Sequence, residues 1–274
     1  MRSALLRGHE HPEIGAVEVV GEGPAAIAIS RGGAAKTYPY TDPNEDAAFF
    51  ALGRAGTLIA VADGHWGSRG SEQVLEHLLT HHATAWTDEP AALPGADAWR
   101  AAALDALVAA NDALLDDAER RSFQPAPSTL SLALARPGDD LLLHASVGDS
   151  HVFRIGGEGV EDLGWASRGR RRCYFLGDAR TEPAQHPERC VIGCEPLGET
   201  RALVLVTDGI SERGIGVGDP TAAVARAVET SAQRDLELRP LAACRGVVDA
   251  ALAAHRKNRA GDNVACALVW LRDR

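Results

Sequence analysis

The stretch Thr57-Leu-Ile-Ala-Val-Ala-Asp63-Gly64-His65 holds an apolar run that ends abruptly in an acid and a glycine. The run is apolar at successive positions, which indicates a central strand covered on both faces by other layers. Ala202-Leu-Val-Leu-Val-Thr207 repeats this pattern and is followed by Asp208-Gly209. The two stretches together predict a packed sheet structure in which acidic residues gather where strands end.

The rest of the chain divides into strand and helix patterns. Further strands are predicted at Ala25–Ile29, Ala47–Leu52, Leu130–Ala135, Leu141–Val147, His151–Ile155 and Val264–Leu271. Helical spacing of alanine and leucine predicts helices over Ser68–His82, Ala96–Arg121, Thr221–Gln233 and Pro240–Lys257. Because strands cluster between helix pairs, the pattern favours an antiparallel α+β layer arrangement over a doubly wound parallel sheet.

Composition limits the class of protein and its partners. The 274 residues are 45% hydrophobic and show no composition break, which predicts one domain over residues 1–274. The formal net charge of -10 disfavours nucleic acid and anionic membranes as main partners. Five cysteines without framework spacing, no apolar run of about 20 residues and a polar N-terminus predict a cytoplasmic protein. The oligomeric state is left open.

An acid stands beside a glycine at four places: Asp63-Gly64, Gly148-Asp149, Asp208-Gly209 and Gly261-Asp262. The pair Glu45-Asp46 precedes the apolar run Ala47–Leu52. Each segment alone is typical of a β-turn. Strand ends in a packed sheet can bring distant carboxylates to one rim, where they repel one another unless a cation neutralises them. Hard oxygen ligands of this kind suit Mg²⁺ or Mn²⁺.

The ordered set resembles the metal-dependent serine/threonine protein phosphatases of the PPM, or type-2C, family. Its landmarks run through most of the chain in the family's order. They are Glu45-Asp46, Asp63-Gly64-His65, Pro127-Ser128-Thr129, Val147-Gly148-Asp149-Ser150, Thr207-Asp208-Gly209 and Gly261-Asp262-Asn263. The resemblance implies a four-layer α-β-β-α sandwich, with two central antiparallel sheets flanked by helix pairs.

The resemblance also implies a binuclear Mn²⁺ or Mg²⁺ centre. Asp63 would bridge both ions, Asp208 and Asp262 would complete the first site, and Glu45 with the Gly64 carbonyl would hold the second. Asp46 would steady the waters, and Asp149 matches an acid that in relatives helps bind a weaker third ion. The implied reaction is hydrolysis of phosphoserine and phosphothreonine by a water that bridges the metals, with His65 as proton donor. The implied partner is a phosphorylated protein, a target of a bacterial Ser/Thr kinase.

Two places depart from the family pattern. Relatives usually carry a phosphate-clamping Arg four residues before the metal-binding acid, where this chain has Thr41; Lys36 and Arg31 lie upstream as substitutes. The long stretch 156–199 predicts an irregular functional flap and lacks the family's usual signature. It carries Arg170, Arg171 and Arg172, which are either a solvated loop or a guide for a phosphopeptide.

Two other functions stay open on the sequence alone. A pseudophosphatase would bind a phosphoprotein without turnover, which Thr41 favours and the retained acids disfavour. A metallophosphatase for a small phosphorylated metabolite is compatible with the unusual flap. His77 and His81 share a helix face and could bind a metal, although a solvated face is the commoner outcome for that spacing.

Overall fold

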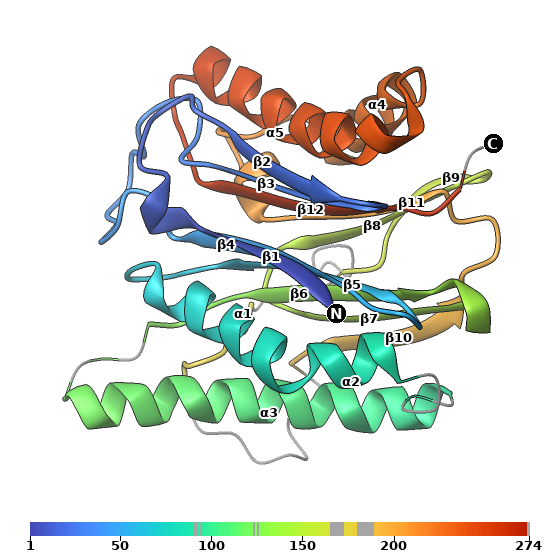
Figure 1. The fold of residues 1–274 in the computed structure, drawn as a ribbon. Helices are drawn as coiled ribbons and strands as arrows, with labels where there is room; N and C mark the ends of the chain where they lie inside the picture. The colour runs from blue at the N-terminus through green and yellow to red at the C-terminus, as the bar shows by residue number, and fades with distance from the viewer. Residues whose placement is uncertain are drawn as a thin grey trace.

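Two six-stranded sheets lie face to face at the centre of the computed structural model (Figure 1). The structure describes residues 1–89, 93, 95–122, 124, 126–164, 173–179 and 189–272. In the first sheet the order is β1 (Arg2–Arg7), β4 (Asp46–Leu52), β5 (Thr57–Asp63), β6 (Leu130–Arg136), β7 (Leu141–Val147) and β10 (Val191–Pro196). In the second it is β2 (Glu18–Glu22), β3 (Ala25–Ser30), β12 (Val264–Trp270), β11 (Ala202–Val206), β8 (His151–Gly156) and β9 (Gly159–Asp162).

Helices cover the outer face of each sheet. The first sheet packs against α1 (Arg69–His81), α2 (Ala83–Asp88) and α3 (Ala96–Arg121), and the second against α4 (Pro220–Ser231) and α5 (Arg239–Asn258). Neighbouring strands in both sheets pair antiparallel. The predicted α-β-β-α sandwich is therefore confirmed. No helix in the described ranges is both long and apolar enough to cross a membrane.

The apolar run of β4 shows why the central strands lack a polar face. Successive side chains of a strand point to opposite faces. Phe49 accordingly packs in the core under α1–α3, whereas Phe50 packs between the two sheets with Ile59 and Leu205. Both faces of the strand are buried, so no position along it faces solvent and favours a polar residue.

Several elements were not predicted from the sequence. The strands β1 and β2 and the short helix α2 lie in segments without a strong periodic signal. The prediction that 156–199 is irregular throughout is wrong at both ends, because β9 and β10 lie within it. Their sequences are Gly159-Val-Glu-Asp162 and Val191-Ile-Gly-Cys-Glu-Pro196, which mix polar residues with glycine or proline and have low strand propensity. Pairing of β9 with β8 and of β10 with β7 stabilises them.

The topology brings the acid-bearing strand ends to one rim. Asp46 starts β4 and pairs in register with Asp63, which ends β5. In the second sheet β11 and β12 pair antiparallel, so Asp208 after β11 and Asp262 before β12 lie at the same end. Asp149 follows β7, whose last residue pairs with the first residue of β6.

We expect Phe50→Ala to lower the free energy of unfolding by about 3–5 kcal/mol, because the 1% exposed ring fills the space between the sheets. Urea unfolding followed by circular dichroism measures the loss. Leu238→Ala, at a residue 50% exposed, is the control and should change stability by about 0.5 kcal/mol or less. Equal effects of the two substitutions would contradict this placement of the core.

Candidate metal centre

Three aspartates from different strand ends meet at the rim. Oxygens of Asp63, Asp149 and Asp208 lie within 4.8 Å of one another, and all three side chains are half-buried. Asp63 closes β5, Asp149 follows β7, and Asp208 opens a short 3-10 turn after β11. Both sheets therefore contribute to the cluster. The Oδ1 atom of Asp149 is buried without a hydrogen-bond partner.

Asp46 ties the two sheets together beside this cluster. Its side chain is almost wholly buried, and its Oδ2 accepts a hydrogen bond of 2.7 Å from the hydroxyl of Thr207. The Thr207 hydroxyl in turn accepts the backbone N–H of Ala265 at 2.9 Å. Because Thr207 immediately precedes Asp208, its hydrogen bond to Asp46 fixes the distance between Asp46 of the first sheet and Asp208 of the second.

The electrostatics of the rim favour a cation. Burial, followed by the charges of neighbouring carboxylates, raises the pKa of Asp63 and of Asp208 well above the ordinary value. Burial also raises the pKa of Asp46 to about 7, although the Thr207 hydroxyl acts in the opposite direction. Carboxylates this close repel one another in a poorly solvated site. The donor set of hard oxygens, with the unpartnered Asp149 oxygen, fits a divalent ion such as Mg²⁺ or Mn²⁺.

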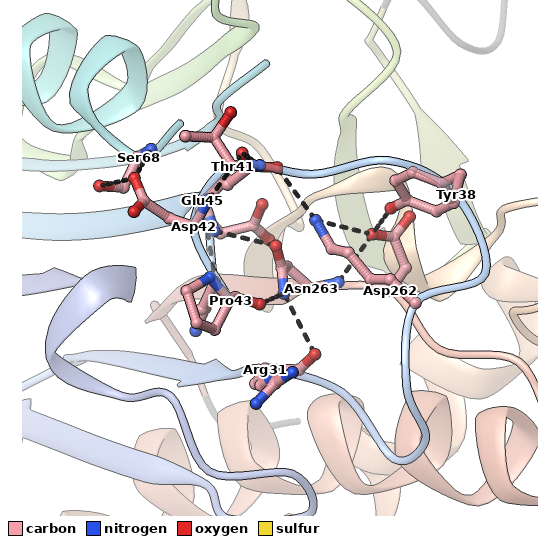
Figure 2. A network of polar contacts seen from close by, with 12 residues as sticks. Arg31, Tyr38, Thr41, Asp42, Pro43, Glu45, Ser68, Asp262 and Asn263 are labelled. Atoms are coloured by element: carbon pink, nitrogen blue, oxygen red, sulfur yellow. Dashed lines mark hydrogen bonds and ion pairs between the residues drawn. The ribbon is translucent and has the colours of Figure 1, made fainter. Parts of the chain in front are cut away.

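Glu45 and Asp262 lie at the same rim but face the segment Lys36–Thr41. The Oε1 atom of Glu45 accepts the backbone N–H groups of Thr41 and Asp42 at 3.1 and 3.3 Å. The Oδ1 atom of Asp262 accepts the hydroxyl of Tyr38, as Figure 2 shows. These two backbone N–H groups hold the Glu45 carboxylate toward that segment.

Asn263 joins the loops that carry these acids (Figure 2). Its Oδ1 accepts the backbone N–H of Glu45 at 2.9 Å, and its Nδ2 donates to the carbonyls of Arg31 and Pro43 at 3.1 and 3.0 Å. Gly209 packs so closely that an added Cβ would lie 1.9 Å from the Asn263 carbonyl oxygen. The glycine beside Asp208 is therefore required by the close approach of the two loops.

A pocket of about 530 Å³ opens over the carboxylates. His65 lines it and has a buried Nδ1 without a hydrogen-bond partner; its ring contacts that of Phe175 at a centroid distance of 4.4 Å and an interplanar angle of 45°. Three exposed aromatic side chains also line the pocket: Tyr38, Tyr40 and Trp66. Trp66 is 73% exposed and has a φ of 69°, a left-handed conformation that is costly for a non-glycine residue.

Most of the residues singled out in the sequence meet here. The rim or its pocket contains Lys36, Glu45, Asp46, Asp63, Gly64, His65, Asp149, Asp208 and Asp262. Arg31 donates to the carbonyl of Pro12. Arg170, Arg171 and Arg172 lie outside the described residues. The rings of His77 and His81 lie 4.6 Å apart and are tilted by 48°, but in the described part of the chain they join no group of three metal-binding side chains.

Sequence reasoning missed some members of the site. Glu212 lines the pocket, and burial raises the pKa of its carboxyl. Its spacing of four from Asp208 in a turn was a usable signal, because the Glu212 N–H donates to the Asp208 carbonyl at 2.7 Å. Tyr38 and Tyr40 gave no such signal, since only the path of their loop brings them to the pocket.

Comparisons with known proteins agree with this geometry. A family model described as "Protein phosphatase 2C" matches residues 38–259. Comparison with curated proteins gave no match. The fold is similar to that of the serine/threonine phosphatase Stp1 from Staphylococcus aureus, with 16% identity, a TM-score of 0.65, and coverage of 92% of this chain and 96% of that one.

Two further solved structures have the same fold. A bacterial serine phosphatase is 17% identical with a TM-score of 0.66, over 92% of this chain and 99% of that one. The catalytic domain of the serine threonine protein phosphatase PstP, described in complex with 2 manganese ions, is 19% identical with a TM-score of 0.60, over 94% and 100% of the two chains. Because the family model covers most of its length, the chain belongs to the protein phosphatase 2C family, as its acidic segments predicted.

Proposed function

We propose that the protein is a metal-dependent phosphatase that hydrolyses phosphoserine and phosphothreonine in protein substrates. The meeting of Asp63, Asp149 and Asp208 within 4.8 Å carries the proposal, because Asp63 and Asp208 also line a pocket. Family membership and the manganese ions of PstP support it. The substrate monoester must be made by phosphoryl transfer to a protein hydroxyl, so the partner proposed upstream is a bacterial Ser/Thr kinase, acting in the cytoplasm.

Each acid of the rim has a proposed role in metal binding. Asp63, Asp208 and Asp262 would hold one divalent ion, and Glu45 with the Gly64 carbonyl a second, with Asp63 shared. Asp46 would order water near them, and Asp149 would serve a weaker third ion. When bound, such ions supply a water nucleophile at neutral pH and neutralise charge on the phosphoryl oxygens.

His65 is the proposed proton donor to the leaving alkoxide of serine or threonine. Its ring lines the pocket, as Asp63 does, and the tilted contact with the Phe175 ring limits its orientation. A proton donated from this position would neutralise the leaving alkoxide as its bond to phosphorus breaks. Lys36 and the arginines at 170–172 are the proposed substrate-phosphate contacts that stand in for the Arg absent at Thr41.

We expect phosphate release from a phosphothreonine peptide in Mn²⁺ and none in excess chelator. Asp208→Asn should keep the fold by circular dichroism and lower kcat/KM by more than about 100-fold, because it removes a charged ligand. Asp249→Asn, at an exposed acid on α5 that pairs with Arg245, is the matched control. If neither the peptide nor an aryl phosphate releases phosphate in a metal-dependent way, the protein is a pseudophosphatase. Release from the aryl phosphate alone indicates a small-molecule substrate.

Asp46 should make the metal-free protein less stable as pH rises. The raised pKa means that the folded state retains a proton that the unfolded chain releases near its ordinary pKa, so the stabilisation present at low pH is lost as pH approaches about 7. Asp46→Asn removes this contribution. Without metal, the melting temperature should fall more between pH 5 and pH 7.5 in the wild type than in Asp46→Asn. Equal falls in the two proteins would refute this role of Asp46.

Trp66 should contribute to binding of the residues that flank the phosphorylated side chain. Its exposed ring lies at the pocket without being a candidate metal ligand. Trp66→Ala is expected to raise KM for a phosphothreonine peptide about tenfold and to leave kcat within about twofold. Leu236→Ala, at an exposed apolar residue outside this pocket, is the control. An unchanged KM in Trp66→Ala would exclude this role.

A further inference from the structure

Lys36 places a positive charge inside the acidic rim. Its Nζ lies 3.2 Å from Oε2 of Glu45 and 3.7 Å from Oδ1 of Asp262, and its side chain is 4% exposed. Glu45 is the acid proposed for the second ion and Asp262 an acid proposed for the first. The ammonium therefore bridges one carboxylate of each proposed metal site.

The backbone holds this lysine in place. Lys36 forms a parallel β-bridge with Gly261, and the Gly261 N–H donates to the Ala35 carbonyl at 3.0 Å. A Cβ on Gly261 would lie 1.8 Å from the carbonyl oxygen of Ala34, so only glycine permits this contact. The segment before Lys36 is thus docked directly against the residue that precedes Asp262.

Neighbouring side chains complete the enclosure of the ammonium. Nζ lies 5.2 and 5.7 Å from the ring centroids of Tyr38 and Tyr40, and Tyr38 also donates to Asp262. The Glu45 and Asp262 carboxylates that contact Nζ favour the charged form of the lysine. The Lys36 ammonium therefore acts as a monovalent counter-ion for these carboxylates.

We propose that Lys36 competes with a divalent ion for Glu45 and Asp262, so that full metal loading requires displacement of its ammonium. This inference rests on the proposed metal centre and adds a control on its occupancy. An ammonium carries one charge and cannot neutralise two carboxylates fully, so a divalent ion can replace it at a reduced net affinity. Once displaced, the Lys36 ammonium would move into the pocket that this residue lines, where it can contact a bound phosphate.

The chain offers a matched pair of variants, because Lys36 and Lys257 are its only lysines. Lys36→Met keeps the length of the aliphatic stem and removes the charge, and Lys257→Met makes the same change at an exposed residue of α5. Calorimetric titration with MnCl₂ should give at least one site bound about tenfold more tightly in Lys36→Met than in the wild type. Lys257→Met should match the wild type.

An equal or weaker Mn²⁺ affinity in Lys36→Met would overturn the competition while leaving the metal centre intact. If Mn²⁺ binds neither the wild type nor Lys36→Met, or binds Asp208→Asn as tightly as the wild type, the proposed centre itself is wrong. These outcomes separate failure of the inference from failure of the proposed function.

A second measurement uses the wild-type protein and does not depend on folding of a variant. Acetylation of lysine by an amine-reactive ester, quantified by mass spectrometry, should be slow at Lys36 and fast at Lys257 without metal. Saturating MnCl₂ should accelerate labelling of Lys36 severalfold and leave Lys257 unchanged. Labelling of Lys36 that is unaffected or slowed by MnCl₂ would contradict displacement of the ammonium.

Discussion

Repulsion among carboxylates at a shared rim is the constraint on which the arrangement of this site depends. Asp46 and Asp63 face each other across β4 and β5, and Asp208 approaches from the other sheet. Their repulsion acts to separate the sheets at this end, against the apolar core between them. The Thr207 hydroxyl on Asp46 and the Lys36 ammonium offset part of it. Divalent ions at the proposed centre would offset most of the remainder.

The sequence predicted the layers and the rim because both follow from strong local signals. Apolar runs with no polar face, such as β5 and β11, must be covered on both sides, and only a stack of layers does that. Each run stops at an acid beside a glycine. Antiparallel pairing then puts alternate strand ends together, which is why Asp46 and Asp63 were found without any structural information.

What the sequence could not predict depends on the path of loops and on pairing. β10 forms because β7 offers it a free edge, although Gly193 and Pro196 weaken its own strand signal. Tyr38 and Lys36 reach the carboxylates because Gly261 lets the backbone of their segment dock beside Asp262. Contacts of this kind join residues more than two hundred positions apart, and no periodicity or motif within either segment encodes them.

The most direct test of a divalent metal centre at this rim is anomalous diffraction from crystals soaked in MnCl₂, measured on both sides of the manganese absorption edge. The predicted result is anomalous difference density beside Asp63, bounded by Asp208 and Asp262 on one side and by Glu45 and the Gly64 carbonyl on the other. Density confined to surface carboxylates, or no density at the rim at saturating manganese, would contradict the proposed centre.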